Sequence, residues 1–545
     1  MDQSYTTSSG TTTNQYTCQT SDVLTPAKIS MLKNYVIPAL LETINNLLQV
    51  ISETGNLVLD SQYHSTYGMN CRSNLAIPSS LLSSGVPSSD YYLMVTARPI
   101  ANPNVLANAL PCSHRIQPGN RFSRPLAGSI NFNPGAAALL YSPNKPFLFN
   151  QILKTALHEM THALGFTNDL FSDYLTPDGG YYAAGVTTTA NYKGETKYLI
   201  NTPRVVSYAQ THYGCSSLTG MELEDQGSNG APGSHWESRL VDSEYMAGVS
   251  SPDSQVSALT LNFFEDMGWY TSNFSMVEEF DYGRGEGCAW ATQPCSSATW
   301  NRYWCQSNSA ADKCNGHRTA VGRCNYAQYT AALPSQYQYF SDPAVGGSNN
   351  WPDYCPVYQG YSNTYCHDPD GLVGSTQYGQ TYSNISRCWD FVSPASSGCY
   401  PTLCGVLPGN TDVTVQVLIS GSWRTCPVGG GNLDVSTSSG TVTVLCPKVE
   451  FFCSAAGKVN FTFNSNNNIP IPNAPTAPGT RTIPGLPDLP FLPPLPQIFP
   501  PSWNFNLTTI GDPWTWTIGS IPFYIVVIGG CLLLFLILLC CCCKK

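Results

Sequence analysis

Charged residues are scarce in this sequence. Asp, Glu, Lys and Arg make up 11% of its 545 residues, whereas an ordinary soluble domain contains about 25%. The formal net charge is −10, so no broad basic surface is expected and nucleic acid is excluded as a partner. A hydrophobic content of 42% excludes a largely disordered chain. The composition indicates a folded protein of roughly two to four domains.

The cysteines lack the spacing of a zinc ribbon. Seventeen of the 22 lie between Cys18 and Cys453, and no Cys-x-x-Cys pair occurs among them. So many scattered cysteines favour a disulfide framework and an oxidising compartment. Because 17 is odd, one thiol is expected to have no partner within this region. Glycosylation sequons, which add modest support for a secreted glycoprotein, stand at Asn273, Asn384, Asn460 and Asn506.

The two ends of the chain differ in character. The first 18 residues lack the basic start and apolar core of a signal peptide, so we expect the natural N-terminus to be missing or the sequence to begin late. Residues 521–543 contain no charge and as a helix would span roughly 34 Å. Lys544 and Lys545 follow and suit the cytosolic side. We predict one transmembrane helix over 521–543, with a cleaved glycolipid-anchor signal as the alternative.

Hydrophobic periodicity predicts a small number of regular elements. Helices are expected at 27–51, 147–165 and 254–267, and strands at 91–97 and 128–132. Pro38 should kink or break the first helix, and Gly268 should end the last. Residues 167–250 are expected to be rich in loops. Twelve prolines between residues 470 and 501 predict a stiff, extended stalk.

The chemistry is concentrated in the segment His158-Glu159-Met160-Thr161-His162. Residues four apart share one face of a helix, so both imidazoles can point at one ion. Glu159 lies beside His158 and can reach a water bound to that ion. Zinc takes nitrogen ligands in a tetrahedron and keeps one position open for catalysis. This pattern is the metalloprotease signature; a core helix with two satisfied histidines is the bland alternative.

A third ligand must come from elsewhere in the chain. Gly165 occupies the glycine position of the contiguous metzincin pattern, but Asn168 stands where that pattern has its third histidine. Glu195 would be the ligand in a glutamate-type site, although its segment is not clearly helical. Among later histidines we prefer His235 and keep His212 as the alternative. His235 lies eleven residues before Met246, in a segment that resembles the metzincin methionine turn.

Several motifs, in order, resemble the leishmanolysin family of surface zinc metallopeptidases. They are HEMTHALGF, LEDQGSNGAPGSHWE, EYMAG, SALTLNFFEDMGWY, YWCQ, FSDPAVGG and DYCPV. The likeness runs from about Cys18 to Cys453. It implies that His158, His162 and His235 bind one zinc ion per chain. Glu159 would then be the general base and later the acid, with Met246 forming the floor of the site.

The family resemblance also implies a fold and a substrate strand. The fold expected is α+β, with metzincin-like catalytic N-terminal and central domains and a disulfide-rich C-terminal domain. The predicted parts are 18–166 with the zinc-binding helix, 167–288 with the third ligand and methionine turn, 289–456 rich in cysteine, the stalk 457–520, and the membrane helix 521–543. Gly128, Ser129 and Ile130 resemble the metzincin edge strand, to which an extended peptide would add; an ordinary core strand is the alternative.

The function expected is that of an extracellular zinc endopeptidase, held at the cell surface by a single-pass anchor in the lipid bilayer. It would hydrolyse peptides and proteins through a zinc-bound water that Glu159 activates. A catalytically dead surface glycoprotein used for adhesion or display is the second hypothesis, and a role in cell adhesion is also compatible with an active enzyme. A zinc exopeptidase with Glu195 as ligand is the third. Both histidines and the glutamate are present, which favours the first.

Overall fold

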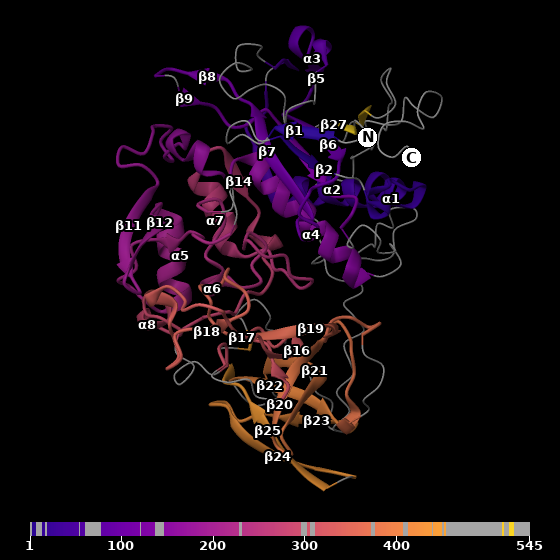
Figure 1. The fold of residues 1–545 in the computed structure, drawn as a ribbon, viewed down its shortest axis with the longest axis vertical. Coiled ribbons are helices and arrows are strands. Elements are labelled where there is room, and N and C mark those ends of the chain that lie inside the picture. The colour runs from indigo at the N-terminus through magenta and orange to yellow at the C-terminus, as the bar shows by residue number, and fades with distance from the viewer. Residues whose placement is uncertain are drawn as a thin grey trace. The chain divides into compact units, whose positions relative to one another are not determined.

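The computed structural model describes most of the chain before the predicted stalk. The described residues are 3–6, 13–16, 19–53, 55–59, 78–119, 121–136, 146–227, 232–295, 302–305, 311–371, 377–406, 412–438, 440–449, 452–453, 515–516 and 523–527. They divide into two compact units, whose elements are labelled in Figure 1. The first comprises Met1–Val186, Leu261–Met276 and Leu495–Lys545, and the second comprises Thr187–Thr260 and Val277–Pro494. Mixed helix and strand confirms the α+β class, whereas the five predicted domain boundaries stay a prediction.

The first unit combines a mixed sheet with helices. Its helices are α1 (Pro26–Met31), α2 (Ile37–Leu47), α3 (Ser79–Ser83) and α4 (Pro146–Leu164), and α7 (Ala258–Asp266) enters it from the second unit. Its strands are β1 (Gln3–Thr6), β2 (Thr13–Tyr16), β3 (Leu48–Val50), β4 (Asn56–Leu57), β5 (Val86–Pro87), β6 (Tyr91–Ala97), β7 (Ala107–Ser113), β8 (Ile116–Gln117), β9 (Arg121–Phe122), β10 (Ala127–Phe132), β14 (Tyr270–Ser272), β26 (Thr515–Trp516) and β27 (Phe523–Val527). The predicted strands at 91–97 and 128–132 and the helix at 147–165 are confirmed.

The first predicted helix forms, but Pro38 does not break it. A π-helical turn, Leu32–Val36, lies between α1 and α2, and Pro38 falls in the first turn of α2. The helix is continuous through this point, and the π-helical turn already interrupts the regular hydrogen-bond ladder next to the proline that lacks an N–H. The chain becomes extended at Leu48, where β3 pairs with β14. The helix therefore ends at Leu47, four residues earlier than predicted, because residues 48–50 form a strand that pairs with β14.

The main sheet of the first unit has the strand order β26-β27-β6-β10-β7. β10 pairs in parallel with β6 and antiparallel with β7, and α4 packs against β10 and β7. The prediction that 128–130 forms an edge strand is therefore wrong. Both backbone edges of Gly128, Ser129 and Ile130 are already paired, so no peptide can add there.

Gly128 has a structural role instead. A Cβ atom built on Gly128 would lie 2.1 Å from the hydroxyl oxygen of Tyr91 and 3.0 Å from the Cβ of Ala163 in α4. Only glycine leaves room for the Tyr91 side chain and α4 to approach the sheet this closely. The glycine that suggested a substrate-binding strand is thus explained by helix–sheet packing.

The C-terminal prediction is only partly covered by the structure. Phe523–Val527 forms β27, paired in parallel with β6, which differs from the predicted helix. The aromatic and β-branched residues of FYIVV have a high propensity for β-strands, which is consistent with this pairing. The rest of 521–543, and the stalk except Thr515–Trp516, lie outside the described residues. Within the described part of the chain, no helix is both long and apolar enough to cross a bilayer.

The second unit begins with elements that the sequence did not reveal. They are β11 (Thr187–Tyr192), β12 (Glu195–Ile200), α5 (Pro203–Tyr213), β13 (Met221–Glu222) and α6 (Ser238–Val241). The region 167–250, predicted to be loop-rich, therefore contains a three-stranded sheet, β11-β12-β13. β11 (TTTANY) is mostly polar, and β12 (ETKYLI) does not alternate polar and apolar residues, so neither strand shows a clear period of two. α7 begins at Ala258, four residues later than predicted, and ends at Asp266, just before Gly268, whose φ of +68° places it in the left-handed region.

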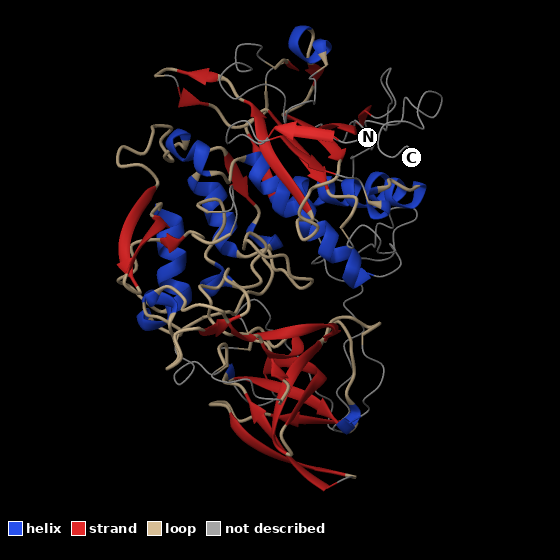
Figure 2. Ribbon diagram, viewed as in Figure 1, coloured by secondary structure: helices blue, strands red, loops and turns tan. Residues whose placement is uncertain are grey.

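Strands make up nearly all the regular elements of the cysteine-rich region, and loops connect them (Figure 2). It contains α8 (Cys288–Thr292), β15 (Lys313–Cys314), β16 (Ala320–Cys324), β17 (Tyr326–Gln328), β18 (Val345–Gly347), β19 (Tyr358–Tyr365), β20 (Ser386–Ser393), β21 (Ser396–Val406), β22 (Val413–Ile419), β23 (Ser422–Thr425), β24 (Gly431–Thr437) and β25 (Gly440–Cys446). Strands β20–β25 form one sheet in the order β23-β22-β21-β20-β25-β24. Trp389, Val415, Val417 and Val444 are fully buried in its core.

Disulfides hold this region together, as predicted. Among the described residues the bonds are Cys215–Cys288, Cys295–Cys355, Cys305–Cys324, Cys314–Cys388, Cys366–Cys399, Cys404–Cys453 and Cys426–Cys446. Cys112 is disulfide-bonded as well. Cys18 and Cys71 lie outside the described residues, and the unpaired thiol stays a prediction.

The glycosylation sequons differ in accessibility. Asn384 is exposed in a turn. Asn273 is half-buried, and its side-chain amide donates a 2.9 Å hydrogen bond to the carbonyl oxygen of Asn46. Asn460 and Asn506 lie outside the described residues. Glycosylation stays a prediction, with Asn384 as the more accessible of the two described sites.

Candidate metal centre

Helix α4 places the two motif histidines side by side. Its apolar residues face the sheet, so the opposite face of its last turns carries His158 and His162, both half-buried. The two Nε2 atoms lie 3.1 Å apart, and the ring centroids are separated by 4.7 Å at an angle of 83°. Glu159 is next to them on the helix and is 6% exposed. One helical segment thus supplies two nitrogens and a carboxyl group.

The tautomer of His162 is set by the backbone beyond the helix. Nδ1 of His162 lies 2.7 Å from the carbonyl oxygen of Phe166. A carbonyl can only accept, so Nδ1 carries the proton and Nε2 presents its lone pair toward His158. A hydrogen bond of this kind also fixes the ring orientation, as is usual for histidines that bind metals.

This donor set fits zinc. Two nitrogens at about 2.0–2.1 Å from a tetrahedral zinc ion lie roughly 3.4 Å apart, close to the 3.1 Å observed between the Nε2 atoms. In the absence of a cation, one imidazole would have to donate a hydrogen bond to the other. A shared cation instead accepts both lone pairs. The half-buried pair with an adjacent carboxyl group is therefore suited to a catalytic zinc site.

Three tyrosine hydroxyls hold the C-terminal end of α4. Tyr91 donates to the carbonyl oxygen of Ala163 at 2.8 Å, Tyr270 to that of Leu164 at 2.7 Å, and Tyr174 to that of Gly165 at 2.7 Å. The last carbonyls of a helix have no partner within the helix, and here buried hydroxyls satisfy them. The turn carrying His162 is thereby anchored to β6, to β14 and to the segment after α4.

Gly165 lets the chain leave the helix directly after His162. Its φ is +132°, a conformation that other residues rarely adopt. An added Cβ would also come within 3.1 Å of the Trp269 ring. The sharp exit brings the Phe166 carbonyl back over His162, which explains the hydrogen bond to Nδ1.

His235 lies in the second unit, on a loop between β13 and α6. It is 8% exposed, and its carbonyl oxygen accepts a 2.9 Å hydrogen bond from the backbone N–H of Glu224. Its ring centroid lies 6.2 Å from the ring of Trp351, with the planes at 84°. The side chain is therefore held in a packed environment.

Met246 is fully buried in a tight turn beside that loop. The backbone N–H of Trp236 donates to the carbonyl oxygen of Met246 at 3.1 Å, and that of Ala247 to the carbonyl oxygen of Glu244 at 2.9 Å. The loop bearing His235 and the turn bearing Met246 are thus joined by main-chain hydrogen bonds. The roles predicted for His235 as a ligand and for Met246 as the floor of the site stay predictions.

The carboxyl group of Glu244 supports the Met246 turn from below. It accepts hydrogen bonds from the backbone N–H of Met246 at 2.5 Å, from Ser257 Oγ at 2.7 Å and from Thr260 Oγ1 at 2.6 Å. Thr260 Oγ1 in turn accepts from the indole N–H of Trp236 at 2.9 Å. Burial raises the pKa of Glu244 to about 7, although these hydrogen bonds act in the opposite direction. Sequence reasoning missed Glu244, since a single glutamate carries no pattern.

The alternative third ligands are engaged elsewhere. Nε2 of His212 lies 2.8 Å from the carbonyl oxygen of Tyr282, and Nδ1 lies 3.3 Å from the hydroxyl of Tyr208. Burial lowers the pKa of His212 to about 4, so it is a neutral core residue. Glu195 lies 2.8 Å from Lys197 Nζ, and Gln336 and Tyr337 also donate to it. Neither side chain is oriented as a metal ligand.

The predicted residues thus fall into two groups. His158, Glu159 and His162 come together on α4 in the first unit, and His235 and Met246 come together in the second. Gly128, Ser129 and Ile130 belong to neither group. The supporting tyrosines and Trp351 were not identified from the sequence, because their contacts join segments far apart in the chain.

A charged histidine holds the residues just before the Met246 turn. Nε2 of His317 lies 3.0 Å from Asp242 Oδ2 and 2.8 Å from Ser243 Oγ, and Nδ1 lies 3.8 Å from Asp281 Oδ1. Burial alone would lower the pKa of His317. The nearby carboxylates of Asp242 and Asp281 outweigh burial and raise the pKa of His317 to about 9.

Stability is therefore expected to fall as pH rises from 6.5 to 9. A histidine whose pKa is higher in the folded state than in the unfolded state stabilises the fold fully at pH values below its unfolded pKa of about 6.5. That stabilisation is lost as the pH rises from 6.5 through the folded pKa of about 9. The contribution of His317 is about 3 kcal/mol at most. Melting temperatures measured across this range should decline, and the decline should be smaller in His317→Gln. His114→Gln is the control, because burial lowers the pKa of His114 to about 4. An unchanged slope in His317→Gln would contradict the assignment.

Comparison with known proteins gives one consistent result. Residues 3–460 match the family model described as leishmanolysin. The leishmanolysin homolog of Crithidia fasciculata is 29% identical over 471 residues, covering 83% of this chain and 68% of that protein. Leishmanolysin of Leishmania tropica is 27% identical over 472 residues, covering 83% and 67%. The leishmanolysin-like peptidase of Caenorhabditis briggsae is 27% identical over 466 residues, covering 69% and 67%.

Proposed function

Since the chain belongs to the leishmanolysin family and is a zinc metalloendopeptidase, we propose that His158, His162 and His235 hold its zinc ion and that Glu159 moves the protons of peptide hydrolysis. The observation that carries the proposal is the pair of Nε2 atoms 3.1 Å apart on α4. Two imidazoles at this spacing supply two of the nitrogen ligands that a catalytic zinc site needs, and Glu159 lies beside them.

His235 is the proposed third ligand for three reasons. It is nearly buried, its loop is held by main-chain hydrogen bonds to the Met246 turn, and the competing residues are engaged. A third imidazole would leave the fourth tetrahedral position for water and substrate, as catalytic zinc requires. Met246 would form the apolar floor beneath the ligands.

In the proposed mechanism the protein groups orient and transfer protons. Zinc, when bound, lowers the pKa of a coordinated water to about 7 and polarises the scissile carbonyl. A carboxylate oxygen of Glu159 removes a proton from the attacking water and delivers it to the nitrogen of the leaving amine. The low exposure of Glu159 keeps that proton from bulk solvent. The Phe166 carbonyl holds His162 in the tautomer that binds the metal.

The edge of the main sheet offers a place for an extended substrate. Among the described strands, β7 stands last in the sheet order and pairs only with β10, and α4 packs against it. A peptide that adds to the open side of β7 would form main-chain hydrogen bonds along the strand, and its side chains would alternate between pockets and solvent. We therefore propose β7, in place of 128–130, as the strand that receives the substrate.

Chelator-sensitive cleavage of an internally quenched peptide tests the function. We expect the full chain to cleave the peptide between two internal residues, to lose activity on treatment with a zinc chelator, and to regain it when zinc is restored. A peptide blocked at both ends distinguishes endopeptidase from exopeptidase activity. A folded, zinc-loaded chain that cleaves no peptide would support the display hypothesis instead.

We also propose that the chain acts at the outer surface of a membrane. The support is the charge-free run 521–543 followed by two lysines, together with a disulfide-rich region suited to an oxidising compartment. The alternative is that this run stays with the sheet through β27. Extraction of cell membranes with alkaline carbonate separates the two. An anchored chain stays in the pellet, and release into the supernatant would overturn the anchor.

A further inference from the structure

A segment of the cysteine-rich region packs directly against the proposed third ligand. A Cβ built on Gly248 would lie 1.9 Å from the Trp351 ring, so the indole covers the backbone at the end of the Met246 turn. The same indole lies edge-on to the His235 ring, with 6.2 Å between centroids. Trp351 is half-buried. One side chain from residue 351 therefore contacts both parts of the site that the second unit supplies.

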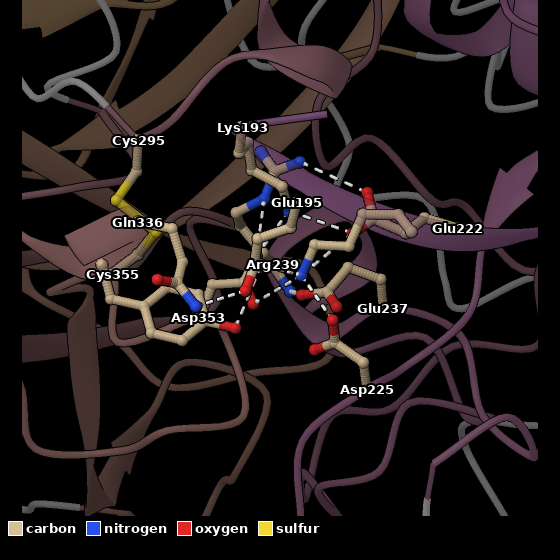
Figure 3. Close-up of polar contacts among 12 residues, drawn as sticks. Lys193, Glu195, Glu222, Asp225, Glu237, Arg239, Cys295, Gln336, Asp353 and Cys355 are labelled. Atoms are coloured by element: carbon tan, nitrogen blue, oxygen red, sulfur yellow. Dashed lines mark hydrogen bonds and ion pairs between the residues drawn. A yellow bond between two sulfur atoms is a disulfide. The ribbon is translucent and has the colours of Figure 1, made fainter. Parts of the chain in front are cut away.

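The position of Trp351 is fixed by Asp353, two residues further on. Asp353 is fully buried, and its carboxylate contacts Lys193 and Lys197 of the β11–β12 hairpin and Arg239 of α6 (Figure 3). Burial opposes ionisation of Asp353, but the three cations more than offset it and hold its pKa below the usual range. Moving a buried carboxylate away from its cationic partners would leave it buried and unpaired, so these ion pairs hold Asp353 in one position.

These ion pairs connect Trp351 to the loop of His235. Arg239 lies four residues after His235, and its guanidinium donates to the carbonyl oxygens of Trp290 and Ala291, each at 2.8 Å. Asp353 therefore contacts a helix that begins almost immediately after the proposed ligand. The ion pair between Asp353 and Arg239 therefore links the segment that carries the Trp351 indole to the segment that carries the His235 imidazole.

The segment is also secured within its own region. The hydroxyl of Tyr339 donates to the carbonyl oxygen of Asp353 at 2.8 Å, and the Cys295–Cys355 disulfide lies at one side of the ion-pair cluster (Figure 3). Asp353 and Tyr354 both have positive φ, +55° and +57°. Non-glycine residues keep this conformation only where the surrounding structure enforces it.

We propose that Trp351 is a positioning residue for the metal centre: anchored through Asp353, it holds the His235 imidazole and the Met246 turn in the arrangement that binds zinc. This inference rests on the proposed role of His235 as the third ligand. An imidazole confined before the metal arrives loses less rotational freedom on binding, so confinement raises affinity. Zinc affinity in this chain then depends on the cysteine-rich region.

The test compares Trp351→Ala, Trp351→Phe and the control Trp423→Ala in the full chain. Trp423 is also half-buried in the cysteine-rich region, on β23. Zinc dissociation constants are measured by competition with a chelator of known affinity. The values of kcat and KM are measured by peptide cleavage at saturating zinc. We expect Trp351→Ala to bind zinc about 10–100-fold more weakly, with kcat and KM close to normal once zinc is saturating. Trp351→Phe should keep most of the affinity, and Trp423→Ala all of it.

Gly248→Ala provides a second variant, because the added Cβ displaces the indole without removing it. It should weaken zinc binding in the same direction. Unchanged affinity in both Trp351→Ala and Gly248→Ala would overturn the proposal, as would an equal loss in Trp423→Ala. His235→Ala distinguishes failure of the positioning role of Trp351 from failure of the proposed ligand role of His235. If His235→Ala loses zinc and Trp351→Ala does not, only the positioning role fails; if His235→Ala keeps zinc, the ligand assignment itself fails.

Discussion

Glu159→Gln is expected to fold, to bind zinc as tightly as the unaltered chain, and to lose about 10²–10⁴-fold in kcat/KM. Glutamine has the same shape as glutamate but cannot accept the proton of the attacking water. The side chain is 6% exposed, so bulk water has little access to replace it as a base. Cleavage of a quenched peptide gives the rate, and metal analysis of the same sample gives zinc content.

The matched control is Glu42→Gln, which alters a half-buried glutamate on α2 of the same unit. It should retain nearly full activity. Turnover retained in Glu159→Gln would show that another group accepts the proton. Loss of zinc together with activity would assign Glu159 to metal binding instead.

His235→Ala should lose zinc, whereas His212→Ala should keep it. Removing a proposed ligand leaves two imidazoles, so we expect a loss of affinity larger than the roughly 10–100-fold typical of changes to groups outside the coordination shell. His212→Ala instead leaves the Tyr282 carbonyl without its donor in the core. Its expected effect is a loss of about 1–3 kcal/mol in stability, with normal zinc content in the folded fraction.

Metal content and unfolding transitions, measured on both variants, show which of the two histidines binds zinc and which stabilises the core. The pair also serves as its own control, since each substitution removes one imidazole from the second unit. If His212→Ala lost zinc and His235→Ala kept it, the two assignments would be exchanged. If both kept zinc, a ligand of another type would have to complete the site.

The local parts of the fold could be predicted because they depend on neighbours in the chain. Periodicity predicted the helix that carries His158 and His162 and the strands β6 and β10. Glycine placement predicted that α7 ends close to Gly268. The polar strands β11 and β12 could not be predicted. Their stability comes from pairing with each other and with β13, and pairing leaves little trace in a short polar segment.

The error about residues 128–130 has a similar origin. The segment was correctly predicted to be a strand, but its place in the sheet depends on which segments lie at its two sides. β6 and β7 occupy both, which makes β10 an interior strand. A free edge is a property of the whole sheet, and no motif within β10 could indicate it.

The sequence by itself indicated the proposed reaction chemistry: a histidine pair four residues apart with an adjacent glutamate, on a segment whose apolar spacing predicts a helix. These are short-range features, set by the 3.6-residue period and by side-chain type. The tertiary structure alone decided how those groups are held. The three tyrosines beneath α4, the Glu244 carboxyl under the Met246 turn, and Trp351 beside His235 come from distant segments. Such contacts arise from packing of the folded chain, which local sequence does not encode.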